Sequence, residues 1–401
     1  MKILSGVLIA LFLHLTAYPQ ELHYVFKDAT HKEIRMGADR TEIYIPLLKN
    51  KRVALCANHT TTLGNQHLVD SLLALNVNVV KLFSPEHGFR GDAEAGKKVN
   101  HSIDKKSGLP IISLYGDHKK PDSNDLRDID IVIFDIQDVG ARFYTYISTM
   151  FYIMDAAAEN NIVVMILDRP NPNGYWVDGP ILQKEYASFV GMHPVPIAHG
   201  MTIGEYAKMI NGEKWLTDGR KCLLQVISMQ AYHHTFRYQL PINPSPNLSS
   251  MTAIYLYPTL CLFEGTPISV GRGTDKPFCV IGHPDISIGN YTFTPKNIPK
   301  VASNVPCRNQ KCNGFDLTTL GNVIMKNKNF INIDLIIEFY NNFPDKNAFF
   351  TPFFDKLAGT DSIRKQIIEG KTADEIRKSW EDDLLAFKKI RKKYLLYGDF
   401  E

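Results

Sequence analysis

The chain has 401 residues, of which 44% are hydrophobic and 22% charged, and its formal net charge is +3. This composition is typical of a globular protein and excludes a largely disordered chain. The charge is too small to indicate binding to nucleic acid or to an anionic membrane surface. The length exceeds what one hydrophobic core usually supports, so we expect two domains.

Residues 1–20 resemble a secretory signal peptide. Lys2 supplies a positive start, Ile3 to Leu15 is mostly apolar, and small residues follow at Thr16 and Ala17. The apolar run is short for a transmembrane helix, although an uncleaved anchor remains an alternative. We therefore expect an exported protein, periplasmic or secreted, with no membrane span in the mature chain.

The first half alternates apolar, strand-like runs with helix-like segments. A parallel sheet covered on both faces produces this pattern, because its strands are buried on both sides. The pattern predicts an α/β fold with a Rossmann-like parallel sheet. The expected strands are 52–58, 77–83, 111–114, 129–135, 162–168 and 223–229, and the expected helices are 68–75, 143–160 and 203–210.

The spacing of Thr202 and Glu205 predicts a capping box at the start of helix 203–210, so Glu205 is not expected to be catalytic. Proline and glycine become frequent from Pro241 onward. We place a domain boundary there, with a Rossmann-like domain at 21–240 and a smaller mixed α+β domain at 241–401. In this second domain we expect helices at 333–343 and from Thr372 to about Tyr394.

Polar side chains gather where the predicted strands end. The carboxyl ends of parallel strands lie along one edge of a sheet, where open α/β proteins bind their ligands. Any one of these residues could instead be a turn former or helix cap, but several strands share the feature. The residues are Asn58 and His59, Glu86 and His87, Asp135 and Asp138, and Asp168 and Arg169.

Several common chemistries have no motif in the chain. A G-x-G-x-x-G after the first strand, a P-loop and a G-x-S-x-G elbow are all absent, so no dinucleotide cofactor or serine nucleophile is expected. The thirteen histidines and six cysteines show no metal-binding spacing, and we expect neither a metal nor another cofactor. Cys56 and Cys261 read as buried thiols, whereas Cys307 and Cys312 could form a local disulfide.

Carboxylate chemistry remains. Glycoside hydrolysis needs an acid at the leaving oxygen and a second group that attacks or stabilises the anomeric carbon. Glu86 is the candidate acid, because Pro85 and Phe89 would partly desolvate it. The candidates for the second role each have a structural alternative, as an ion pair, a cap or a turn; they are Asp135, Asp138, Asp168 and Glu264.

A series of motifs carries a family resemblance from about Arg40 to the C-terminus. The motifs are SPEHGFRG (84–91), GLPIISLYG (108–116), FDIQDVGARFYTY (134–146), LDRPNPNG (167–174), HGMTIGEYA (199–207), PSPN (244–247), LCLFEGT (260–266), GRGTDKPF (271–278) and KYLLY (393–397). In this order they resemble the NamZ-type exo-β-N-acetylmuramidases, a glycoside hydrolase family. The chain departs from the family's usual pattern at Pro267 and Val270, near the expected cleft.

The resemblance implies release of N-acetylmuramic acid from the non-reducing ends of peptidoglycan fragments, in a cleft between two domains. It implies Glu86 as the acid. The partner would be a muropeptide or the disaccharide of N-acetylmuramic acid and N-acetylglucosamine. The lactyl carboxylate of this substrate needs a cation, and an arginine can hold it in a bidentate fork. The arginines in the shared motifs are Arg90, Arg142, Arg169 and Arg272, with Arg142 and Arg272 preferred.

Tyr144 and Tyr146 could stack on the sugar or serve only as core, and His87 could orient Glu86 or contact the sugar. The acetamido group of the substrate would also permit a reaction without a protein nucleophile. The residues themselves leave two alternatives to this enzyme open. One is a muropeptide-binding protein without catalysis, and the other is a metal-dependent hydrolase or deacetylase.

Overall fold

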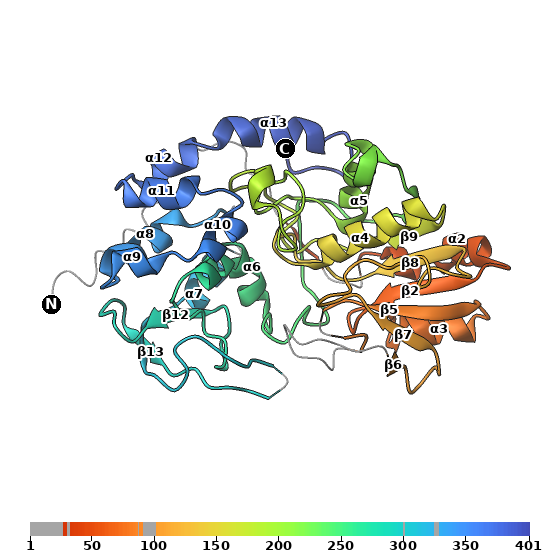
Figure 1. The fold of residues 1–401 in the computed structure, drawn as a ribbon, viewed down its shortest axis with the longest axis horizontal. Coiled ribbons are helices and arrows are strands. Elements are labelled where there is room, and N and C mark those ends of the chain that lie inside the picture. Colours follow the sequence, from red (N-terminus) through yellow and green to blue (C-terminus); the bar gives the residue numbers. More distant parts are fainter. Residues whose placement is uncertain (1–26, 30–32, 87, 91–101, 300, 325–328) are drawn as a thin grey trace.

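A Rossmann-like sheet forms the N-terminal half of the molecule (Figure 1). The computed structural model describes residues 27–29, 33–86, 88–90, 102–299, 301–324 and 329–401. The seven-stranded sheet has the order β10-β9-β8-β2-β5-β7-β6. Its strands are β2 (Val53–Ala57), β5 (Val79–Ser84), β6 (Ser102–Ile103), β7 (Pro110–Ser113), β8 (Ile131–Asp135), β9 (Val163–Leu167) and β10 (Leu223–Ile227).

The strand order creates a switch point beside β2. The chain builds outward from β2 to β5 and β7, then returns to the other side of β2 with β8, β9 and β10. These neighbours are parallel, and only the short edge strand β6 runs antiparallel. In such sheets the crevice beyond the carboxyl ends of the strands at the switch point is the usual ligand site. The predicted parallel sheet is therefore confirmed.

Alternate residues of the central strands pack into two separate cores. Cys56 and Phe134 point into the larger core with α4 (Tyr146–Glu159) and α5 (Ile203–Gly212). Leu55 and Ile133 point into the smaller core, which contains α3 (Leu68–Ala74). Both faces of the central strands are thus covered, which explains why β2 and β8 are buried at every position.

The C-terminal half combines a small sheet with a run of helices. The antiparallel sheet has the order β12-β14-β13. Its strands are β12 (Val280–His283), β13 (Tyr291–Phe293) and β14 (Cys312–Asp316). The helices are α6 (Met251–Leu260), the 3₁₀ helix η5 (Cys261–Gly265), α7 (Thr318–Ile324), α8 (Ile333–Asn342), α9 (Lys346–Phe349), α10 (Pro352–Ala358), α11 (Ser362–Ile368), α12 (Ala373–Lys378) and α13 (Glu381–Arg391). This agrees with the predicted smaller α+β domain.

The short elements add to the edges of this framework. They are the helix α2 (Thr41–Tyr44), the parallel pair β1 (Lys27–Ala29) and β11 (Phe236–Tyr238), and the antiparallel pair β3 (Thr62–Leu63) and β4 (Gln66–His67). The capping box of α5 is present as predicted: the Glu205 carboxylate accepts from the Thr202 N–H at 2.9 Å.

The prediction of one long final helix is wrong. Thr372 does cap a helix, but α12 ends at Lys378 and a separate helix, α13, begins at Glu381. Trp380 lies between them in a non-helical conformation, with φ −118° and ψ 5°. Its ring is buried, and its indole N–H donates to Asp178 at 3.2 Å. A continuous helix would change the direction of this side chain, so burial of the tryptophan accounts for the break.

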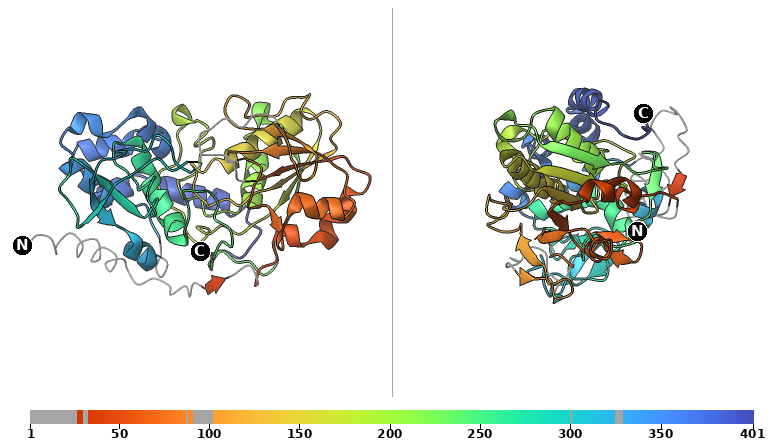
Figure 2. Two further views of the ribbon diagram at one scale, coloured as in Figure 1. Left: turned by 90° about the horizontal axis from the view of Figure 1, so that it is seen from below. Right: turned by 90° about the vertical axis from the view of Figure 1, so that its right-hand side faces the viewer.

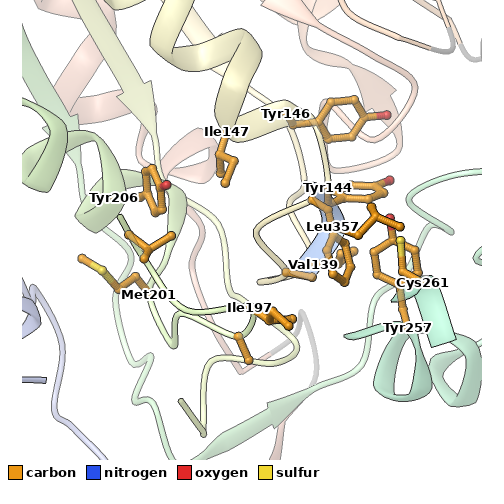
Figure 3. Close-up of a cluster of buried hydrophobic side chains, with 14 of the residues drawn as sticks. Val139, Tyr144, Tyr146, Ile147, Ile197, Met201, Tyr206, Tyr257, Cys261 and Leu357 are labelled. Atoms are coloured by element: carbon orange, nitrogen blue, oxygen red, sulfur yellow. The ribbon is translucent and has the colours of Figure 1, made fainter. Parts of the chain in front are cut away.

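The two halves share one continuous apolar core. Figure 3 shows Val139, Tyr144 and Ile197 from the first half beside Tyr257 and Leu357 from the second. The two lobes lie side by side in Figure 2, and α13 carries the chain back toward the first lobe in Figure 1. Near its end, the Tyr397 hydroxyl donates to Asp168 at 2.5 Å. The C-terminus is thereby fastened to the end of β9.

The cysteines are free thiols, including Cys307 and Cys312, and the expected burial of Cys56 and Cys261 is confirmed. Within the described ranges, no helix combines the length and the apolar character needed to cross a bilayer. The predicted signal peptide at residues 1–20 lies outside the described residues.

Candidate functional site

Glu86 is placed by the end of strand β5. Proline at position 85 cannot donate to a strand ladder, so β5 ends at Ser84 and the chain turns at Glu86. The hydroxyl of Thr145 donates to Glu86 Oε2 at 2.9 Å. Thr145 is the N-cap residue of α4, but its side chain makes no capping bond, so the hydroxyl is available to Glu86. The sheet and the long helix thus fix the carboxylate together.

Tyr115, which follows β7, is a second group close to Glu86. Burial, together with the charge of Glu86 and a hydrogen bond to it, raises the pKa of Tyr115. The tyrosine therefore keeps its proton and acts as a donor to the carboxylate at neutral pH. Tyr115 and Thr145 were not among the predicted site residues, although both lie inside the shared sequence motifs.

Two adjoining cavities meet at Glu86 and Arg272, which line both of them. The inner cavity has a volume of about 70 Å³ and the outer one about 370 Å³. Glu86 comes from the first half of the chain and Arg272 from the second, so the two domains share the site. The other residues that line the inner cavity are Phe143, Tyr144, Thr145, Tyr146, Ser245, Asn247, Leu248, Tyr257 and Phe278.

The inner cavity has aromatic walls. Tyr257 packs edge-on against Phe143, Tyr144 and Phe278, with ring centroids 5.3, 5.8 and 5.1 Å apart. Tyr144 also meets Tyr146 at 4.9 Å (Figure 3). The Tyr144 hydroxyl donates to the Pro244 carbonyl at 2.9 Å. The cavity thus combines aromatic rings with several polar side chains, those of Glu86, Thr145, Ser245, Asn247 and Arg272.

The outer cavity carries an ion pair on its wall. Arg272 Nε lies 2.7 Å from Glu264 Oε1, and the guanidinium sits 5.4 Å from the centre of the Phe278 ring. Burial works to lower the pKa of Arg272, but Glu264 and more distant groups, Glu86 among them, raise it above its usual value. The remaining wall is largely apolar and includes Ile268, Val270, Val305, Pro306 and the partly exposed ring of Phe353.

Comparisons with known proteins cover both halves of the chain. The family model for the N-terminal part of the exo-beta-N-acetylmuramidase NamZ matches residues 53–252, and the model for its C-terminal part matches residues 255–397. This chain belongs to the NamZ exo-β-N-acetylmuramidase family. The family is one of glycosidases, as the sequence motifs implied.

Individual relatives are also similar over most of the chain. The peptidoglycan beta-N-acetylmuramidase NamZ of Bacillus subtilis strain 168 is 41% identical over 374 residues, which are 88% of this chain and 89% of the relative. A crystal structure of a DUF1343 family protein from Bacteroides fragilis NCTC 9343 matches with a TM-score of 0.84 at 52% identity. A second such protein from that strain matches with 0.78 at 29%. Each match covers 91% of this chain and 99% of the other.

The predicted acids Asp135 and Asp138 do not line either of the two cavities described for this NamZ-family protein. Asp135 is fully buried and forms a two-point ion pair with Arg169, whose Nη2 lies 2.8 Å from Oδ2. Asp138 accepts from the Gly140 N–H at 2.6 Å, and burial raises its pKa to about 7. Neither is among the described residues that line the cleft. These contacts favour a structural role.

Asp168 likewise connects several elements of the structure. Its two oxygens accept from the Thr202 hydroxyl and the Gly204 N–H, both at 2.8 Å, and from Tyr397. Burial raises its pKa to about 6. The residue thus joins β9, the start of α5 and the C-terminal segment, which leaves no oxygen directed to either cavity.

Arg142 occupies an interior position between the domains. Its guanidinium donates to four backbone carbonyls, those of Pro180, Val195, Leu357 and Ala358, at 2.6–3.0 Å. It is fully buried and lines neither cavity among the described residues. Burial lowers its pKa to about 9, so the side chain remains charged at neutral pH.

Arg90 is held by two carboxylates. Its guanidinium donates to both oxygens of Asp104 at 2.7 Å and approaches Asp70 at 3.3 Å. Of the four predicted arginines, Arg272 is the one that lines the cavities.

Asn58 and His59 follow β2 at the switch point. The Asn58 side chain accepts from the Thr60 N–H at 2.9 Å and shapes the turn there. His59 Nε2 is 2.8 Å from the Asn243 carbonyl, which ties this loop to the start of the second domain. Burial lowers the pKa of His59. His87 lies outside the described residues.

No group of three or more His, Cys, Asp or Glu side chains in the described part of the chain is arranged to hold a metal ion.

The lining residues that sequence reasoning missed fall into two groups. Ser245, Asn247 and Phe278 lie in shared motifs, so their motif membership was the available signal. Phe353 lies in none of them, and its position follows only from the packing of α10.

Proposed function

We propose that this protein is an exo-acting glycoside hydrolase that releases N-acetylmuramic acid from the non-reducing ends of peptidoglycan fragments, with Glu86 as the general acid. The observation that carries the proposal is the position of Glu86, at the junction of two cavities in a NamZ-family fold. The Bacillus subtilis relative is a peptidoglycan beta-N-acetylmuramidase, which supports the substrate class. Muropeptides or the muramyl disaccharide are the proposed partners.

The general acid donates a proton to the glycosidic oxygen as the bond to the anomeric carbon breaks. Glu86 has a direct path to the outer cavity, and Thr145 and Tyr115 hold its carboxyl group in place. The second role in the reaction falls to Glu264, which lines the outer cavity, or to the acetamido group of the substrate. The buried contacts of Asp135 and Asp138 make both poor candidates.

Arg272 is the proposed partner of the lactyl carboxylate. A substrate carboxylate would share the guanidinium with Glu264 or replace it, and arginine suits two-point binding of this kind. Tyr144 and Tyr146 are proposed to pack against the sugar or its substituents from the inner cavity.

The test uses two substrates whose leaving groups differ in their need for a proton. One is the 4-nitrophenyl β-glycoside of N-acetylmuramic acid, and the other is the disaccharide with N-acetylglucosamine. Glu86→Gln should reduce kcat/KM on the disaccharide by about 10²–10⁴-fold, the usual contribution of general acid catalysis. The loss on the nitrophenyl glycoside should be smaller, because nitrophenolate leaves without protonation.

Glu264→Gln is the comparison variant, since it makes the same change at the other glutamate that lines the outer cavity. If Glu264 serves only to hold Arg272 in place, Glu264→Gln should reduce kcat/KM by the same factor on both substrates. Near wild-type turnover of the disaccharide by Glu86→Gln would show that another group is the acid. The wild-type protein should retain its activity in a chelator, whereas loss of activity there would favour a metal-dependent hydrolase.

We also propose that the protein is exported and acts in the periplasm or outside the cell. The support is the leader-like composition of residues 1–20. Sequencing the N-terminus of the protein recovered from cell fractions tests this. A cytoplasmic protein that retains Met1 would contradict the proposal.

A further inference from the structure

We propose that the inner cavity is the pocket for the acetamido group of the terminal sugar, and that Asn247 accepts its N–H. This inference rests on the proposed function and adds the way in which the sugar is oriented.

The first observation is an unmatched acceptor. Asn247 is 3% exposed and lines the inner cavity, and its Oδ1 atom has no hydrogen-bond partner. Its amide nitrogen donates to the Val301 carbonyl at 3.2 Å, which fixes the orientation of the amide and leaves the oxygen as the acceptor. A buried acceptor without a partner is costly, so the site calls for a ligand that brings a donor. An acetamido N–H is such a donor, whereas a lactyl carboxylate has none to offer.

The second observation is size. The inner cavity, of about 70 Å³, is well above the roughly 10–15 Å³ that a single buried water needs, so it has room for a group of several heavy atoms. An acetamido group, with its nitrogen, carbonyl carbon, oxygen and methyl, is a small substituent that suits the smaller of the two cavities. The outer cavity, of about 370 Å³, has room for the sugar ring.

The chemistry of the walls agrees with this assignment. Around Tyr257, the edge-on rings of Phe143 and Phe278 present apolar surface suited to a methyl group. Ser245 adds a hydroxyl to the lining, which is able to bind the amide carbonyl.

The third observation is the order of the groups at the mouth of the cavity. In N-acetylmuramic acid the glycosidic oxygen, the acetamido group and the lactyl ether are on C1, C2 and C3. Glu86 and Arg272 both line the two cavities, so they stand where the cavities join. With the C2 substituent in the inner cavity, the neighbouring atoms C1 and C3 lie at this junction, within reach of the acid and the cation that line it. A single placement of the sugar therefore brings the glycosidic oxygen to Glu86, the lactyl carboxylate to Arg272 and the acetamido N–H to Asn247.

A cycle that combines a protein change with a substrate change tests the inference. The protein change is Asn247→Ala, and the substrate change replaces the acetamido N–H with oxygen, giving a 2-O-acetyl sugar. For the wild-type protein, we expect the acetamido compound to be favoured by about tenfold, both in kcat/KM of the disaccharide and in the calorimetric Kd of the free monosaccharide. In Asn247→Ala this preference should fall to about twofold or less.

Asn329→Ala is the matched control. Asn329 is also buried and donates from its amide to a backbone carbonyl, that of Tyr255 at 3.0 Å, but it does not line the cavity. It should retain the full preference, even if the protein loses stability.

The size of the inner cavity allows a second test of the inference. Replacing N-acetyl by N-hexanoyl should reduce binding to the wild-type protein by more than about tenfold, and Leu248→Ala, which enlarges the inner cavity, should recover part of that loss. An unchanged acetamido preference in Asn247→Ala, or equal binding of the hexanoyl sugar by the wild-type protein, would overturn the inference. Binding with the predicted preferences but without hydrolysis would instead refute the proposed function and retain the pocket.

Discussion

Replacing Arg142 with Met should lower the stability of the folded protein and leave its affinity for substrate unchanged. The guanidinium lies between the domains and donates to Pro180 and Val195 on one side and to Leu357 and Ala358 on the other. The latter two carbonyls are at the C-terminal end of α10, where a cation also meets the negative end of the helix dipole. Methionine fills a similar volume but leaves these acceptors without their charged donor.

The size of the effect follows from these contacts. A single unsatisfied buried group costs about 1–3 kcal/mol, and removing one partner from a buried charged network typically costs about 3–5 kcal/mol. Since the stability of most proteins is about 5–15 kcal/mol, this is a large fraction of the total. The unfolding entropy of a 401-residue chain is about 0.8 kcal/mol/K, so we expect Tm to fall by about 4–6 °C.

Arg272→Met provides the contrast, because Arg272 lines the cavities and is partly exposed. Urea and thermal unfolding, together with KM for a muramyl disaccharide, should separate the two variants. Arg142→Met loses stability and keeps KM, whereas Arg272→Met keeps Tm within about 1 °C and raises KM. If Arg142→Met instead retains the wild-type Tm and raises KM, then the structural role assigned to Arg142 is wrong and it is the arginine that binds the carboxylate.

Two further predictions concern buried positions. Burial raises the pKa of Asp138 to about 7, so the folded state retains this proton to higher pH than the unfolded state does. The resulting stability is complete below pH 4 and is lost as the pH rises through 7; from pH 5 to 8 the loss is about 3 kcal/mol. Urea unfolding should show this loss in the wild-type protein but not in Asp138→Asn, and parallel profiles would contradict it. Gly265→Ala should cost about 1–3 kcal/mol, because its Cβ would lie 2.4 Å from Phe354 Cα in α10. An unchanged Tm would show that α10 is free to move.

The sequence by itself determined the Rossmann-like sheet and the position of Glu86. Runs such as 53–57 and 131–134 are apolar throughout because both faces of a parallel strand are buried, and that burial is visible in composition alone. Pro85 marks the end of β5 for a local reason, its missing N–H. The order of the family motifs also indicated the kind of reaction, which is glycoside hydrolysis.

Only the tertiary structure decided which charged residues reach the cleft. Arg142 and Arg272 look alike in sequence, since each follows a glycine-containing turn in a shared motif. One is enclosed by backbone carbonyls and the other lines both cavities. The partner of a charged side chain is usually distant in the chain, as Ala358 is from Arg142, so no local pattern records it. The break at Trp380 has the same cause, because it depends on a contact with Asp178.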